Sequence, residues 1–223
     1  MLTIQGPSLL REVIIMGKVE LNKQKKQASL LQAAFELFTK KGFAKTTVSD
    51  IAKQSGLAKG TFYLYFKDKY DLRNKLTAHK AAQLFGDAHN ALIKADVKGF
   101  ENQMMFILDY IIDRLAADPP LLVFISKNLS WGVFRSAFSQ TVPEESEQFY
   151  EKYMHMMEES NIRCREPELM LFTMVELVSS TCYSCILMGQ PVSMEEYLPY
   201  LHQAIHQIFL LYTSPGSDPL PKS

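Results

Sequence analysis

Residues Thr46 to Lys69 read TTVSDIAKQSGLAKGTFYLYFKDK, and this stretch decides the fold of the first part of the chain. It contains a threonine that can cap a helix, a short amphipathic segment, a turn that carries Gly56, and a second short segment. The second segment shows Lys, Gly, Thr and Tyr where a core helix would show an apolar face. This order is typical of a helix-turn-helix whose second helix enters a groove of DNA.

Three helices are expected around this motif. An apolar stripe at helical spacing predicts the first over residues 25–41. Thr47 caps the second and forms a capping box with Asp50, three residues later. Gly56 can adopt the positive φ that a tight turn needs, and the third helix is expected over residues 58–66.

The rest of the chain also has apolar residues at helical spacing, punctuated by prolines. The sequence therefore predicts an all-α protein, with a three-helix helix-turn-helix head followed by a larger helical domain. Further helices are expected over residues 68–93, 99–117, 120–129, 144–159, 167–188 and 194–211.

The zero net charge of the 223-residue chain conceals a strong asymmetry. Residues 18–80 contain 14 Lys and Arg against 5 Asp and Glu, a net charge of +9. Residues 81–223 contain 9 Lys and Arg against 18 Asp and Glu, a net charge of −9. The basic part is suited to contact a polyanion, and the acidic part is not.

Several polar side chains of the motif are candidates for DNA contacts. Lys59 can donate to guanine or to phosphate, and the hydroxyls of Thr61 and Tyr63 suit phosphate oxygens. Gly60 costs about 1 kcal/mol of helix stability relative to Ala, which close approach of the backbone to DNA would explain. The expected DNA contacts are Thr47, Lys59, Gly60, Thr61, Tyr63, Leu64, Lys67 and Lys69.

Each of these residues also has a simpler interpretation. Thr47 can act as a helix cap alone. Lys67 and Lys69 can be solvated surface groups. Tyr65 is expected to pack against the core rather than to reach DNA.

Residues 25–76 resemble the DNA-binding domain of the tetracycline repressor (TetR) family. The matching stretch, from Ala33 to Leu72, is AAFELFTKKGFAKTTVSDIAKQSGLAKGTFYLYFKDKYDL. The resemblance implies an α-helical homodimer in which each head reads one operator half-site, and a carboxy-terminal domain that dimerises and holds a small-molecule pocket. Leu64 departs from the family, because many members have a phosphate-contacting His there; Leu64 either removes this contact or touches a thymine methyl.

The resemblance implies a transcriptional regulator that binds double-stranded operator DNA. We expect a cytoplasmic homodimeric repressor that a small-molecule effector releases from its operator. Two alternatives remain open: a TetR-like module that binds another protein, and a regulator that senses thiol oxidation or metal through Cys182 and Cys185. No catalytic constellation is recognisable, so we expect neither an enzyme nor a cofactor.

The acidic part of the chain is rich in aromatic and sulfur-containing side chains, some of which are expected to line an effector cavity. Glu176 is the only charged residue between Leu169 and Gly189. We expect it to be buried, paired with a cation on another helix or at the dimer interface, or facing the effector. The candidate pocket residues are Phe106, Tyr110, Trp131, Phe134, Tyr153, Met174, Glu176 and Tyr183.

The cysteines fit a reducing compartment. Their number is odd, three in all, and no secretory signal precedes them. Cys182 and Cys185 lack a second ligand pair, so buried thiols are expected rather than a metal site. The apolar stretch around them is interrupted by polar residues and is interpreted as a core helix, not as a membrane span.

The expected domain boundaries follow from these patterns. A leader covers residues 1–22, of which residues 1–15 are the part whose presence in the native protein is open. The helix-turn-helix domain covers residues 23–83, with its motif at about 47–66. An effector-binding and dimerisation domain covers residues 84–213, and its last two helices are expected to pair with those of a second subunit. A disordered tail is expected over 214–223.

Overall fold

The chain divides into two compact units, Met1–Leu76 and Thr77–Ser223. The computed structural model describes residues 7–134, 149–160 and 162–213, with only the helical backbone for 7–17 and 149–150. All regular secondary structure in these ranges is helical, which confirms the all-α prediction.

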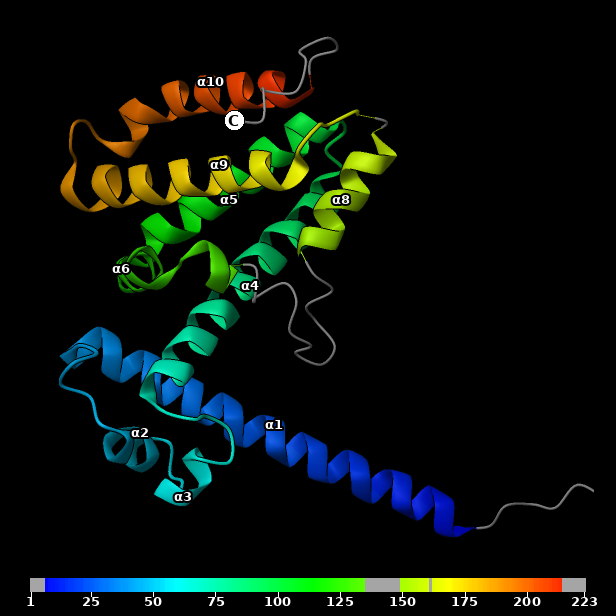
Figure 1. Cartoon of the computed structure of the whole chain (residues 1–223), viewed down its shortest axis with the longest axis vertical. Coiled ribbons are helices and arrows are strands. Elements are labelled where there is room, and N and C mark those ends of the chain that lie inside the picture. The colour runs from blue at the N-terminus through cyan, green and yellow to red at the C-terminus, as the bar shows by residue number, and fades with distance from the viewer. Residues whose placement is uncertain (1–6, 135–148, 161, 214–223) are drawn as a thin grey trace, which may run out of the picture. The chain divides into compact units, whose positions relative to one another are not determined.

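The first unit contains the predicted helix-turn-helix. Its helices are α1 (Pro7–Lys41), α2 (Val48–Gln54) and α3 (Lys59–Phe62), followed by the first turns of α4 (Lys69–Ala95). α2 packs on α1, and α3 packs on α2 (Figure 1). Their shared core consists of Leu30, Ala34, Phe38, Ile51, Ala52, Phe62, Phe66, Leu72 and Leu76.

The first helix is longer than the sequence pattern predicts. We expected it to begin near residue 25, after a separate leader, but α1 is continuous from Pro7. The segment 18–29 lacks an apolar stripe, yet it is rich in Lys and Gln, which favour helix without any packing partner. Periodicity therefore located the packed part of α1 and missed its solvent-exposed extension.

The third helix is shorter than predicted. α3 ends at Phe62, and the chain continues to Phe66 as a tighter turn. The amides of Leu64 and Tyr65 donate to carbonyls three residues back, at 3.2 and 3.0 Å. Such bonds wind the backbone more tightly than an α-helix. The turn nevertheless returns Phe66 to the core, as expected.

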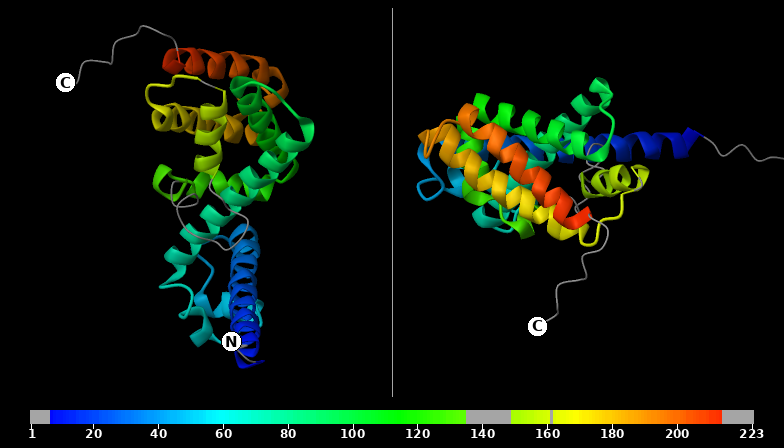
Figure 2. Two further views of the ribbon diagram at one scale, coloured as in Figure 1. Left: turned by 90° about the vertical axis from the view of Figure 1, so that its right-hand side faces the viewer. Right: turned by 90° about the horizontal axis from the view of Figure 1, so that it is seen from above.

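The second unit is a bundle formed by the rest of α4 and by the helices that follow. These are α5 (Phe100–Ala117), α6 (Pro119–Asn128), α8 (Phe149–Glu159), α9 (Pro167–Cys182), the π-helical segment η1 (Tyr183–Met188) and α10 (Met194–Thr213). α10 packs along α9 and also contacts α5, and the views agree that α9 and α10 lie side by side (Figure 2).

The bounds of these helices are close to those predicted. Asp68 caps α4, since its carboxylate accepts from the amides of Tyr70 and Asp71, both at 2.8 Å. The predicted helix 167–188 is α-helical to Cys182 and π-helical from there to Met188. The start predicted for α8 at residue 144, and the tail 214–223, lie outside the described residues.

The segment Pro167–Met188 is long and apolar enough to cross a membrane by length and composition. It packs against α10, and its buried side chains include Met170, Leu171, Met174 and Cys182. The packing agrees with the interpretation of this segment as a core helix, although its opposite face is exposed.

Candidate nucleic-acid interface

The amino terminus of α2 is held by the predicted capping box. The Thr47 hydroxyl accepts from the Asp50 amide at 3.1 Å, and the Asp50 carboxylate accepts from the Thr47 amide at 2.8 Å. The ammonium of Lys41 donates to the same carboxylate at 2.8 Å. These bonds lower the pKa of Asp50 to about 2, and the bond from Lys41 has the largest effect. Thr47 is therefore a cap, and its exposed position also leaves it accessible to DNA.

α3 is anchored by one side and exposed on the other. Phe62 and Phe66 are buried, with their ring centroids 5.5 Å apart. Tyr63 is 53% exposed and Leu64 is 80% exposed. An apolar side chain as open as Leu64 has no packing role within the protomer.

Lys59 and Gly60 extend this exposed face, and Thr61 is half-buried. A Cβ added to Gly60 would meet no protein atom within 4 Å, and Gly60 is not among the residues with positive φ. Neither the backbone conformation nor the space inside the protomer therefore requires glycine at this position. Any requirement for glycine at position 60 must therefore come from a binding partner.

Lys69 is occupied within the protein. Its ammonium donates to the carbonyls of Phe43 and Thr46, both at 2.8 Å, and lies 4.3 Å from the centre of the Phe43 ring. Lys69 thus fastens the start of α4 to the turn that precedes Thr47. This role could not be predicted from the sequence, because it depends on contacts between two segments far apart in the chain.

Lys67 differs from Lys69 although it is only two residues away. Its side chain is exposed, and its backbone amide donates to Asp71 at 2.9 Å. Tyr65 is half-buried and lies beside Phe66, as expected, with 6.4 Å between the ring centroids. Six of the eight expected DNA contacts are therefore exposed: Thr47, Lys59, Gly60, Tyr63, Leu64 and Lys67.

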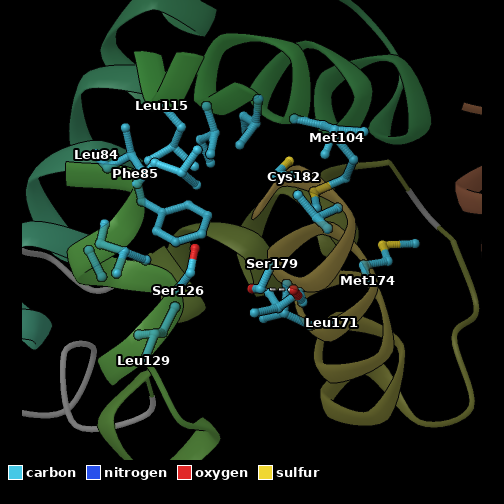
Figure 3. Close-up of a pocket in the computed structure, with 18 of the residues that line it drawn as sticks. Leu84, Phe85, Met104, Leu115, Ser126, Leu129, Leu171, Met174, Ser179 and Cys182 are labelled. Carbon is cyan, nitrogen blue, oxygen red and sulfur yellow. Dashed lines mark hydrogen bonds between the residues drawn. The ribbon is translucent and has the colours of Figure 1, made fainter. Parts of the chain in front are cut away.

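The second unit contains an apolar cavity of about 90 Å³ (Figure 3). Its walls come from α4, α5, α6, α9 and α10, and aliphatic side chains dominate. The lining residues are Ala81, Leu84, Phe85, Met104, Ile107, Leu108, Ile111, Leu115, Leu122, Ile125, Ser126, Leu129, Leu171, Met174, Val175, Val178, Ser179, Cys182 and Ile205.

Of the side chains that the sequence suggested for an effector pocket, only Met174 lines this cavity. Phe134 is buried between Phe85 and Trp131, at centroid distances of 5.5 and 5.1 Å. Tyr153 is buried and donates its hydroxyl to the Pro167 carbonyl at 3.0 Å. The residues that do not line the cavity are Phe106, Tyr110, Trp131, Phe134, Tyr153, Glu176 and Tyr183.

Glu176 is exposed in the protomer, so the expectation of a buried carboxylate is wrong at this level. It lies on the outer face of α9, one turn beyond the partly exposed Phe172. Burial of the Glu176 carboxylate, as expected, therefore requires contact with a second subunit. Asp109, another carboxylate of this unit, lies 2.6 Å from His202 Nε2 and joins α5 to α10.

The thiols of Cys182 and Cys185 are poorly suited to sensing oxidants or metal ions. Cys182 and Cys185 are buried. Burial raises the pKa of the Cys182 thiol to about 12, with a smaller contribution from Cys185, and burial also raises that of Cys185. A protonated, buried thiol is a weak nucleophile and a weak metal ligand. Among the described residues no group of three or more His, Cys, Asp or Glu could hold a metal ion.

The outer faces of α9 and α10 carry large apolar side chains. Tyr200 is 68% exposed and Leu211 is 62% exposed, and Leu169, Phe172 and Leu210 are also on the surface. The described protomer leaves this pair of adjacent helices uncovered.

The comparisons with known proteins agree with this geometry. Residues 30–76 match the model of a family described as bacterial regulatory proteins, tetR family. The HTH-type transcriptional regulator YvdT of Bacillus subtilis (strain 168), itself uncharacterized, is 36% identical over 93 residues, which are 40% of this chain and 43% of that protein. The fatty acid metabolism regulator protein of the same organism is 43% identical over 61 residues, 27% of this chain and 31% of that protein. The matched region thus spans less than half of each of these curated relatives.

Solved structures extend the likeness to most of the chain. A TetR transcriptional regulator from Rhodococcus sp. RHA1 has a TM-score of 0.60 at 18% identity, covering 85% of this chain and 98% of that one. The fatty acid degradation regulator FadR from Bacillus halodurans has a TM-score of 0.58 at 17% identity, covering 81% and 94%. Identities this low show a shared fold and nothing more. Residues 30–76 thus match the tetR family of bacterial regulatory proteins, and most of the chain shares the fold of solved TetR-family regulators.

Proposed function

We propose that this protein is a sequence-specific, DNA-binding transcriptional regulator of the cytoplasm. It acts as a homodimeric repressor that a small-molecule effector releases from operator DNA. The observation that carries the proposal is the exposed face of α3. This face presents Lys59, Gly60, Tyr63 and Leu64, while Phe62 and Phe66 hold the segment against the core.

The electrostatics of the chain support DNA as the partner. The region 18–80 has a net charge of +9, and its Lys59 and Lys67 side chains are exposed next to the motif. A surface with this charge gains affinity for DNA when it displaces condensed counterions. The alternative of a protein-interaction module does not explain why the exposed residues are basic and hydroxylated, or why Gly60 is present.

The uncovered face of α9 and α10 supports the dimer. A two-fold axis through this face would bury Tyr200 and Leu211 in a four-helix interface. A second subunit also provides a second recognition element. Two half-sites supply the affinity and selectivity that one short helix such as α3 lacks.

The cavity supports control by an effector. α4 contributes Ala81, Leu84 and Phe85 to the cavity wall, and the same helix begins at Lys69 in the first unit. A ligand that displaces the wall shifts α4, which belongs to both units. Coupling between two such sites is typically about 1–3 kcal/mol. Two of the similar proteins are named as regulators of fatty acid metabolism and of fatty acid degradation, which makes a lipid-derived signal one form of this proposal.

Selection of bound DNA from a random double-stranded pool tests the proposal. The expected result is an enriched sequence with two half-sites whose centres lie about 10 base pairs, or a multiple of this, apart. Binding of the enriched sequence should weaken steeply as the salt concentration rises. A pool that shows no enrichment after repeated rounds would contradict sequence-specific binding and favour the protein-interaction alternative.

A further inference from the structure

The walls of the apolar cavity restrict the charge of any molecule that binds there. Among the described lining residues, none is an Asp, Glu, Lys, Arg or His. The Cys182 thiol is uncharged at neutral pH because burial raises its pKa. An ion that entered this cavity would lose its hydration without gaining a counter-charge. The cavity therefore favours uncharged molecules.

Two hydroxyl groups interrupt the apolar wall. The Ser179 hydroxyl donates to the carbonyl of Val175 at 2.6 Å, as a helical serine often does. Ser126 on α6 has no hydrogen-bond partner within the described part of the chain, and Figure 3 shows its hydroxyl next to Phe85 on the inner side of the cavity. A hydroxyl can both donate and accept. Ser126 is thus the group best placed to bond to a polar atom of a ligand.

The volume of the cavity restricts the size of the ligand. A volume of about 90 Å³ is smaller than that of the engineered protein cavity, roughly 150 Å³, that binds benzene. Met104 and Met174 both line the cavity, and their unbranched side chains can change rotamer to enlarge it. A single ring or a short alkyl chain can be accommodated in this way, whereas a bulky polycyclic molecule cannot.

We infer that the cavity binds an uncharged, mainly apolar molecule of the size of one substituted ring, whose hydroxyl or carbonyl oxygen is hydrogen-bonded by Ser126. This inference names the chemical class of the effector and so rests on the effector part of the proposed function. It places the specificity-determining contact on α6 and the adaptable contacts on α5 and α9.

Calorimetric titration of the full-length protein at pH 7 with four probes of similar shape tests whether the cavity prefers uncharged molecules. The probes are p-cresol, toluene, p-toluate and 4-methylbenzylammonium. p-Cresol is expected to bind about fivefold more tightly than toluene, the gain from one neutral hydrogen bond. Both charged probes are expected to bind at least about tenfold more weakly than toluene, because burying their charge is costly.

Ser126→Ala tests the assigned hydrogen bond. This variant should lower the affinity for p-cresol to that for toluene and leave toluene binding unchanged. Ser180→Ala is the matched control, since Ser180 is exposed on α9 and does not line the cavity. It should change the binding of neither probe.

Three results would overturn the inference: binding of none of the four probes, charged probes that bind as tightly as p-cresol, or a preference for p-cresol that survives in Ser126→Ala. DNA binding by the wild-type protein, measured without any probe, separates this inference from the proposed function. Normal DNA binding without probe binding removes the inference alone. If p-cresol binds as expected but no DNA is bound selectively, the proposed function is wrong, while the inferred class of ligand still holds.

Discussion

At the scale of single residues, the candidate interface separates side chains that hold the motif from side chains that are free to contact DNA. Phe62 and Phe66 belong to the first group, and Lys59, Gly60 and Leu64 to the second. The sequence could predict this division on α3, because apolar anchors and polar residues alternate with helical spacing. It could not predict the role of Lys69, which is decided by carbonyl groups some 25 positions earlier.

Gly60→Ala tests why glycine stands on the exposed face of α3. The new Cβ would meet no protein atom, so stability should be unchanged or rise by up to about 1 kcal/mol. DNA affinity should fall about tenfold, equivalent to about 1.4 kcal/mol, because the methyl group would block close approach of the backbone. Thermal melting and fluorescence anisotropy with the selected DNA measure the two effects. Unchanged affinity would show that glycine is not needed for DNA contact.

Lys69→Met and Lys67→Ala form a matched pair that separates a positioning lysine from a phosphate contact. Loss of the bonds from Lys69 to Phe43 and Thr46 should cost about 1–3 kcal/mol of stability without changing the slope of log affinity against log salt. Lys67→Ala should leave the melting temperature unchanged and reduce that slope by about 0.9, the contribution of one phosphate contact. A slope reduced in Lys69→Met would instead place its ammonium on the DNA backbone.

At the scale of elements, local signals located the helices, and tertiary packing decided where they end. The capping box of α2 and the Asp68 cap of α4 could be predicted because they depend on residues within three positions. The length of α1 could not, since residues 18–29 lack the apolar stripe that marks its packed part. The early end of α3 could not either, since no proline or side-chain cap marks it. The residues that line the cavity were not predicted, for a related reason. On α5 its lining side chains repeat every three or four residues, as ordinary core residues do.

The capping box predicts a pH dependence for the first unit. The pKa of Asp50 is lowered from 3.8 to about 2, chiefly by the Lys41 ammonium and the Thr47 amide. Its stabilising contribution is thus complete above the unfolded value and is lost as the pH falls towards about 2. Wild type should melt above Asp50→Asn at pH 7, and the difference should shrink between pH 4 and pH 2, measured by circular dichroism. A difference independent of pH would show that the carboxylate charge does not contribute.

The uncovered face of α9 and α10 predicts the effect of a single charge. Leu211→Glu should weaken self-association about thirtyfold or more, because it would bury an unpaired charge where a hot-spot side chain is worth about 2 kcal/mol or more. Sedimentation equilibrium measures the association, and circular dichroism checks that the helices persist. Val19→Glu is the control, since Val19 is an exposed apolar residue on α1. A monomeric wild-type protein, or a Leu211→Glu dimer as stable as wild type, would rule out this interface.

At the scale of the whole molecule, charge and connectivity indicate a division of tasks. The basic region 18–80 contains the exposed face of α3, and the acidic region 81–223 contains the cavity and the face of α9 and α10. The sequence predicted this division from charge alone. It did not predict which residues line the cavity, because it weighted large aromatic side chains, whereas the lining is mainly aliphatic. Of those aromatic side chains, Phe134 and Tyr153 are buried elsewhere in the core.

The central claim is that the exposed face of α3 reads a DNA sequence. The most direct measurement is the ratio of dissociation constants for the selected DNA and for a shuffled DNA of the same composition, at one salt concentration, for wild type and Lys59→Ala. A specific regulator is expected to prefer the selected DNA by about 10³ or more. In Lys59→Ala this ratio should fall by about tenfold if Lys59 contacts a base, at about 1–3 kcal/mol per contact. A wild-type ratio near one would contradict the account.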